Sequence, residues 1–89
     1  MEFKQLEMFV ALADERHVAR AAERVFRTQP AVSMAIAKLE EEVDAKLFVR
    51  SENFRLTRFG EILYVYAEQL LRLRDEATAA LCRGPRRSC

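Results

Sequence analysis

The residues with the clearest chemical meaning in this chain are hydrogen-bonding side chains at the expected start of a helix. Thr28 precedes Gln29 and Pro30, and Ser33 follows about one turn later. The Thr28 hydroxyl is placed to accept from an early backbone N–H, and a first helical turn tolerates proline because its N–H groups lack partners. Side chains in the place of Gln29 and Ser33 can hydrogen-bond to base edges in a major groove. The pattern predicts non-covalent recognition.

Two helices joined by a short polar break are expected to hold these side chains in place. In the first helix, Ala21 and Ala22 are small enough to let a partner helix approach closely, and Val25 continues their face. In the second helix, apolar residues recur with the 3.6-residue period of a helix that packs on a core. They are Val32, Ile36, Leu39 and Val43, and the opposite face carries Pro30, Met34, Ala37, Lys38 and Glu41. The spacing predicts a helix-turn-helix, although crossed helices also serve as packing alone.

The distribution of charge matters more here than its sum. The formal net charge of +1 argues against strongly electrostatic binding to nucleic acid. Residues 16 to 58 nevertheless hold nine Arg or Lys against six Asp or Glu, and four of those acids lie together at the far end of the second helix. On one continuous helix, a basic stripe would be formed by Arg16, Arg20, Arg24 and Arg27. The alternative is that these arginines lie on a solvent-exposed face and pair with nearby acids. This alternative is least expected for Arg27, which lies beside the turn.

No group of residues is arranged for catalysis or metal binding. Cys82 and Cys89 lack a CxxC spacing, and no histidine is near enough to complete a site with them. His17, the single histidine, is expected to be a turn or cap residue. There is no Ser/His/Asp or Cys/His arrangement and no glycine-rich phosphate loop. We therefore expect no enzyme activity, no cofactor and no metal.

Length and composition predict a single, mainly helical domain. Eighty-nine residues suffice for one modest core, and only two Gly and two Pro favour helix over disorder. No apolar run is long enough to span a membrane and no export signal is recognisable, so the expected location is cytoplasmic.

Further elements are expected on both sides of the helix pair. Residues 2 to 15 form an amphipathic helix that braces it. Residues 47 to 50 are β-prone, residues 51 to 53 have turn chemistry, and residues 54 to 57 alternate, which predicts a hairpin. Three helices and a small hairpin make a winged helix-turn-helix, whose wing lies along DNA with Arg50 and Arg55 as candidate contacts. The hairpin could also simply cover the core with Leu47, Phe48 and Leu56.

The last element is a long helix, from Thr57 to about Cys82. Its apolar residues follow a 3.5-residue repeat, and they are Phe59, Leu63, Tyr66, Leu70, Leu73, Ala77 and Ala80. A helix of this length extends about 36 Å, well beyond a small domain, so its far half needs a partner. We expect a homodimer through this helix; the alternative is a linker to a further segment. The expected division is residues 1–57 as the winged domain, 58–82 as the dimerisation helix and 83–89 as a disordered basic tail.

Residues 1 to about 80 resemble the N-terminal DNA-binding region of LysR-type bacterial transcriptional regulators. The segments that carry the resemblance, in order and with the right spacing, are EFKQLEMFVALADE, ARAAERVFRTQPAVSMAIAKLEEEV, KLFVR and RLTRFGE. The resemblance implies a winged helix-turn-helix with a long dimerisation helix, and two such heads on an interrupted, dyad-symmetric promoter site. It also implies a larger effector-binding domain that these 89 residues do not contain, so no small-molecule effector site is expected in them.

The resemblance also assigns positions that meet DNA. On the recognition helix they are Thr28, Gln29, Pro30, Ser33, Met34 and Lys38, and on the wing Arg50 and Arg55. The charge pattern adds Arg27, beside the turn, as a further candidate DNA contact. Where the family often has polar or basic residues, this chain has Met34, Ala35 and Ala37, so specificity is expected to depend on Gln29, thymine methyl groups and DNA shape. The wing is one residue shorter than the commoner pattern.

Two functions from different classes follow. The first is sequence-specific binding of double-stranded DNA by a dimer in bacterial transcription regulation. The alternative is an interaction module whose long helix pairs with another regulator without binding DNA well itself. The near-neutral charge and the few polar side chains on the recognition helix favour the alternative slightly. Salt-sensitive binding of DNA by the purified homodimer discriminates between them.

Overall fold

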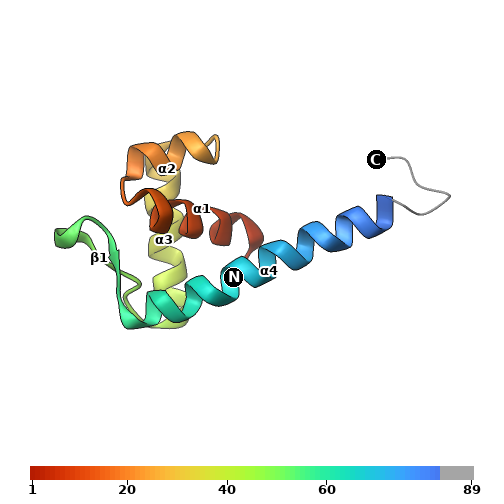
Figure 1. Ribbon diagram of the computed structural model, residues 1–89. Helices are drawn as coiled ribbons and strands as arrows, with labels where there is room; N and C mark the ends of the chain where they lie inside the picture. Colours follow the sequence, from red (N-terminus) through yellow and green to blue (C-terminus); the bar gives the residue numbers. More distant parts are fainter. Residues whose placement is uncertain (83–89) are drawn as a thin grey trace.

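Three short helices cross one another at one end of the molecule, and a longer helix leaves them as an arm (Figure 1). The computed structural model describes residues 1–82. Its elements are α1 (Phe3–Glu15), α2 (Val18–Arg24), α3 (Gln29–Val43), β1 (Phe48–Val49), a 3-10 turn (Arg50–Glu52), β2 (Arg55–Leu56) and α4 (Arg58–Cys82). This order confirms the predicted winged helix-turn-helix with a long final helix. The predicted basic tail, residues 83–89, lies outside the described residues.

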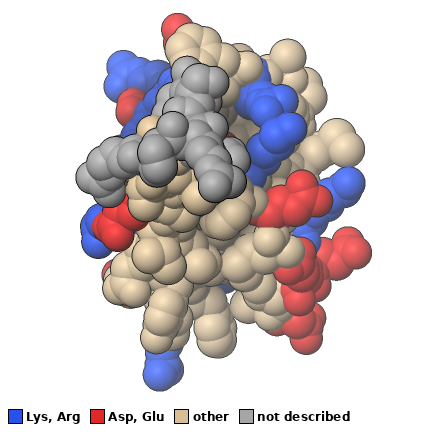
Figure 2. Space-filling view, turned by 90° about the vertical axis from the view of Figure 1, so that its right-hand side faces the viewer, with Lys and Arg blue, Asp and Glu red and all other residues tan. Residues whose placement is uncertain are grey.

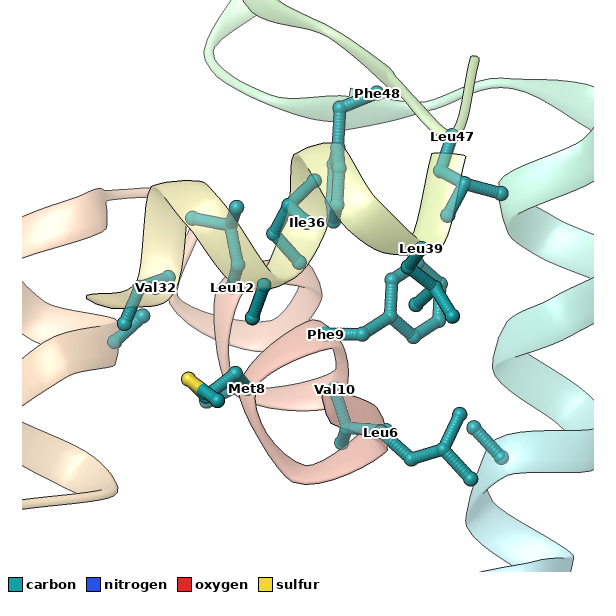
Figure 3. Packing of buried hydrophobic residues seen from close by; sticks show 14 of the residues in the cluster. Leu6, Met8, Phe9, Val10, Leu12, Val32, Ile36, Leu39, Leu47 and Phe48 are labelled. Carbon is teal, nitrogen blue, oxygen red and sulfur yellow. The ribbon is translucent and has the colours of Figure 1, made fainter. Parts of the chain in front are cut away.

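The core lies between α1 and α3, whose buried side chains interleave (Figure 3). Phe9 of α1 is fully buried, and the predicted stripe of α3 is buried as expected through Val32, Ile36 and Leu39. The close approach of α2 rests on Ala21 and Ala22, which are 0% and 4% exposed. The face of α3 opposite the core is therefore the one left for a ligand.

The turn between α2 and α3 closes in a Schellman motif, the backbone pattern that often ends a helix. The Arg27 N–H donates to the Ala22 carbonyl at 2.9 Å, and the Phe26 N–H donates to the Glu23 carbonyl at 3.2 Å. Phe26 takes the left-handed backbone conformation, with φ of 57°, at the position where glycine is usual. Its side chain is 94% exposed. The turn delivers the chain directly to Thr28, which caps α3.

The expected continuous basic stripe is not present, because the first helix ends at Glu15 and the next begins at Val18. Arg16 ends α1 in the left-handed conformation, with φ of 57°, and its N–H donates to the Leu12 carbonyl at 2.7 Å. Arg24 instead pairs with an acid at the surface, as the alternative predicts: its guanidinium donates to the Asp14 carboxylate at 2.8 Å. The condition for a basic stripe, one continuous helix through these arginines, is therefore not met, because the backbone reverses at Arg16.

The hairpin, which we call the wing, pairs Phe48 with Leu56 and Val49 with Arg55 in an antiparallel register. Phe48 is buried against Phe9, with 5.4 Å between their ring centroids. Leu47 is also buried, and Leu56 is half-buried. The wing thus covers the core as predicted, while its turn projects away from it (Figure 1).

The junction between wing and arm is built on the backbone of Lys46 and Leu47. Thr57 donates its hydroxyl to the Lys46 carbonyl at 2.6 Å and its N–H to the Leu47 carbonyl at 3.0 Å. The same hydroxyl accepts from the Gly60 N–H at 3.1 Å, which caps the start of α4. From the other side, the buried Glu40 carboxylate accepts from the Leu47 N–H at 2.8 Å.

The arm packs on α1 through its first half. Ala67 is fully buried there, and Leu71 is half-buried against the core. Tyr64 donates its hydroxyl to Asp14, which also accepts from Arg24, so one carboxylate connects α4, α1 and α2. That hydrogen bond raises the pKa of Tyr64. Further along, Arg74 lies 3.3 Å from the Glu7 carboxylate.

We predict that Gly60→Ala destabilises the fold by about 1–3 kcal/mol. A Cβ at this position would lie 2.2 Å from the Leu47 carbonyl oxygen, a backbone atom that is held by Thr57 and cannot move aside cheaply. Urea unfolding followed by circular dichroism measures the change. Gln69→Ala, at an exposed position of the same helix, should stay within about 0.5 kcal/mol of wild type. Equal stability of the two variants would contradict the close approach.

A second prediction concerns the buried carboxylate. Glu40→Ala leaves the Leu47 N–H without its acceptor and should cost about 1–3 kcal/mol in the free energy of unfolding. The matched control is Glu41→Ala, which removes the same group from the exposed neighbouring position and should change stability by less than about 0.5 kcal/mol. Thermal unfolding monitored at 222 nm compares the two, and similar losses would show that Glu40 does not fix the junction.

Candidate nucleic-acid interface

The N-terminal end of α3 is capped and open to solvent. Thr28 accepts through its hydroxyl from the Ala31 N–H at 3.2 Å, as the sequence predicts, and Pro30 lies in the first turn. Gln29, Pro30 and Ser33 are all exposed. Because the first backbone N–H groups of a helix lack partners within it and carry partial positive charge, this end favours a nearby phosphate.

The exposed face of α3 continues from this end with apolar and basic side chains. Met34 is 60% exposed, and Ala37 and Lys38 are exposed one turn further on. Ala35, in contrast, is only 7% exposed and packs into the core, so it contributes nothing to this face. The arrangement offers few hydrogen-bond donors, but Met34 and Ala37 can contact thymine methyl groups.

Several cations near this face have no carboxylate partner within residues 1–82. Arg27 beside the turn, Lys38 on α3 and Arg50 on the wing are exposed and form no ion pair there. Arg24 and Arg74, on the side that faces α1 and α4, are both paired with acids. The described ion pairs therefore leave positive charge available next to the recognition helix.

The wing presents two arginines in different states. The Arg50 guanidinium lies 5.8 Å from the centre of the Phe54 ring. Arg55 donates to the Glu52 carboxylate at 2.9 Å, and this contact lowers the pKa of Glu52. Both arginines are exposed, as the sequence predicts for wing contacts.

Arg16 was considered for a basic stripe, but the structure gives it a different position. Its guanidinium donates to the backbone carbonyls of Glu52 and Asn53, each at 3.0 Å, and so ties the wing turn to the end of α1. Nothing in the sequence connects positions 16 and 53, because the contact depends on the reversal of the chain after α1.

The predicted dimerisation stripe lies along one side of α4 and, apart from Leu63, which packs against the core, is mostly exposed within residues 1–82. Phe59, Tyr66 and Leu73 are 57%, 60% and 62% exposed. Uncharged side chains cover much of the face seen from the arm's end (Figure 2). The remaining stripe residues are Leu63, which is half-buried, and Leu70, Ala77 and Ala80, which are exposed.

A second stripe of α4, which sequence analysis missed, holds the arm to the head. It consists of Gly60, Tyr64, Ala67, Leu71 and Arg74. These residues also repeat at spacings of 4 and 3, so the signal was present in the sequence. This second repeat was overlooked because it contains a glycine, a tyrosine and an arginine, whereas the neighbouring stripe is more apolar.

Comparison with known proteins places these features in a family. Residues 3–61 match the bacterial regulatory helix-turn-helix proteins of the lysR family. The chain is 46% identical over 83 residues to the HTH-type transcriptional regulator DgdR of Burkholderia cepacia, which covers 92% of this chain and 28% of that protein. It is 45% identical over 78 residues to the regulator BudR of Klebsiella aerogenes, which covers 86% and 54%. The chain thus spans about a quarter to a half of the relatives it matches.

Solved structures agree with this comparison. A crystal structure of the BenM DNA-binding domain with benA site 1 DNA superposes with a TM-score of 0.88 at 34% identity, covering 93% of this chain and 94% of that one. Vibrio fischeri DarR in complex with DNA gives a TM-score of 0.85 at 33% identity, covering 91% of this chain and 28% of that one. No helix within residues 1–82 has the length and apolar character needed to cross a membrane.

Proposed function

The chain belongs to the LysR family of bacterial helix-turn-helix regulators, and on this premise we propose that it binds double-stranded DNA as a homodimer and acts in transcription regulation. The observation that carries the proposal is the capped, exposed N-terminus of α3 with the hydrogen-bonding side chains of Gln29 and Ser33 beside it. In a helix-turn-helix, this end of the second helix enters the major groove.

The side chains near this end divide into two roles. Gln29 can hydrogen-bond both to the adenine N6 amine and to N7, and Ser33 to several bases, while Met34 supplies an apolar contact to a thymine methyl group. The Thr28 hydroxyl and the backbone N–H groups at the helix start suit a phosphate, as do Arg27 and Lys38 as cations, whereas Pro30 has no donor and can offer only an apolar contact. Because Gln29 is the longest polar side chain at the helix end, it is the main candidate for base discrimination.

The dimer is supported by the apolar stripe of α4, most of which is exposed within residues 1–82. Its residues repeat every 3.5 positions, which is the period of two helices that pack along each other. Two apolar side chains outside the stripe are also exposed on this helix: Ile62 is 50% exposed and Leu81 is 58% exposed. A second arm would remove this apolar surface from water, and two heads held by paired arms suit an interrupted, dyad-symmetric site.

No catalytic role is proposed. The relatives reported above are transcriptional regulators, and the candidate interface contains no nucleophile with an adjacent base. A protein that acts on promoter DNA in a bacterium is expected in the cytoplasm.

An interaction module is the second candidate function. Two observations favour it. The net charge is only +1, and the exposed face of α3 has few polar side chains because Met34 and Ala37 occupy part of it. Such a module would form dimers with another regulator through α4 without binding DNA well. Fluorescence anisotropy of the purified homodimer on duplex DNA at two salt concentrations distinguishes the two candidate functions. Salt-sensitive binding supports the first function, and dimers without measurable DNA affinity support the second.

We predict that Gln29→Ala weakens specific DNA binding by about 1–3 kcal/mol and relaxes the preference at one base pair. The cause is the loss of the amide that pairs with a base edge. Anisotropy titrations on the preferred duplex and on single-base variants of it measure both effects. Glu76→Ala, on the far part of the arm, is the control and should leave the base preference unchanged. Unaltered affinity of the Gln29 variant would assign base reading to other residues.

We also predict that Leu73→Glu converts the dimer into a monomer at micromolar concentration, because it places a charge in the middle of the apolar stripe. Thr78→Glu introduces the same side chain at an exposed position off the stripe and should leave the dimer intact. Sedimentation velocity gives the masses of both variants. If Leu73→Glu remained dimeric with a native circular dichroism spectrum, the stripe would not be the dimer interface.

A further inference from the structure

The two arginines of the wing differ in what holds them. Arg55 is engaged by the neighbouring Glu52: its Nε donates to the carboxylate at 2.9 Å, and Nη1 donates to the Leu56 carbonyl at 3.4 Å. Arg50 has no carboxylate partner within residues 1–82, and its guanidinium lies over the Phe54 ring. Both side chains reach solvent, so the difference lies in their partners and not in their exposure.

The wing turn that carries these partners is fixed from behind. Asn53 and Phe54 are consecutive residues in the left-handed conformation, with φ of 55° and 53°. Arg16 holds the turn through two hydrogen bonds to its carbonyls. The Phe54 ring packs edge-on against Phe48, with 6.0 Å between ring centroids, and Phe48 in turn packs on Phe9 in the core. Arg50 therefore rests on an aromatic platform that is continuous with the core.

A phosphate affects these two arginines differently. Glu52 accepts from Nε of Arg55, so a phosphate that binds bidentately through the Nε–Nη2 edge must displace Glu52, although other N–H donors of the guanidinium stay open to it. A guanidinium over an aromatic ring keeps its N–H donors available, since the ring contacts only its face. Binding of Arg50 to a phosphate thus adds a contact, whereas bidentate binding of Arg55 through its Nε edge replaces the contact with Glu52.

We propose that Arg50 is the wing residue that binds the DNA phosphate, and that Glu52 is a latch that withholds Arg55 from DNA. This inference rests on the proposed function, since it assigns roles within a DNA-binding wing. With these roles, only one of the two arginines of the wing attracts a DNA phosphate. Glu52 also becomes a residue that lowers DNA affinity at every sequence.

The test uses the full 89-residue chain and a fluorescein-labelled duplex of random sequence, titrated by anisotropy at several salt concentrations. Arg50→Gln should reduce the slope of log affinity against log salt by about 1.8 per dimer, because each of the two wings loses one phosphate contact worth about 0.9. Arg55→Gln should leave that slope within error of wild type. Both side chains are exposed, so neither variant should change the thermal unfolding midpoint, which circular dichroism checks.

The latch itself is tested by a double-mutant cycle. Glu52→Gln should tighten binding about threefold or more and steepen the salt slope by about 1.8 per dimer, because Arg55 of each wing becomes available to phosphate. In the Arg55→Gln background, Glu52→Gln should have little effect. Glu76→Gln, which changes the net charge equally on the distant arm, is the control and should leave affinity nearly unchanged.

Three results would overturn the inference in different ways. Equal tightening by Glu52→Gln with and without Arg55 would show a general charge effect and no latch. Equal losses of slope for Arg50→Gln and Arg55→Gln would show that both arginines bind phosphate. Absence of salt-sensitive binding by the wild-type dimer would overturn the proposed function, and the roles of the wing residues with it.

Discussion

The backbone at Lys46 and Leu47 is the point on which the relative positions of recognition helix, wing and arm depend. The Leu47 N–H is held by a buried carboxylate of α3, and its carbonyl by the residue that caps α4. Gly60 lets the first turn of α4 come so close that a methyl group would not fit. Because buried backbone groups are costly to leave unpaired, this junction admits one arrangement of the three elements.

Contacts further along the arm also fix its position relative to the head. Asp14 accepts from Tyr64 of α4 and from Arg24 of α2, and Arg74 reaches Glu7 on α1. The apolar stripe proposed for the dimer is one position away from these contacts on the same helix. Its orientation relative to the N-terminus of α3 is therefore fixed within each chain, so dimerisation through the stripe would set the distance between two recognition helices.

Sequence patterns predicted the elements well but the contacts between distant elements poorly. The period of Val32, Ile36 and Leu39 identified the buried face of α3, and the Thr28 cap was read from residue type alone. The end of the first helix at residue 15 was predicted, but the left-handed conformation of Arg16 was not, because an arginine seldom takes it. Glu40 is one of the four acids at the far end of the second helix, and its burial was not predicted, because it depends on the chain that returns at Leu47. Roles of the individual interface residues remain predictions.

We infer that the head and the paired arms present two recognition helices to one DNA site. Selection of bound duplexes from a randomised pool by the purified 89-residue protein, followed by sequencing, tests it most directly. We expect an enriched motif of two inverted half-sites at one fixed spacing, because the arm holds both heads in a set orientation. Enrichment of single half-sites at variable spacing, or of no sequence at all, would contradict the claim.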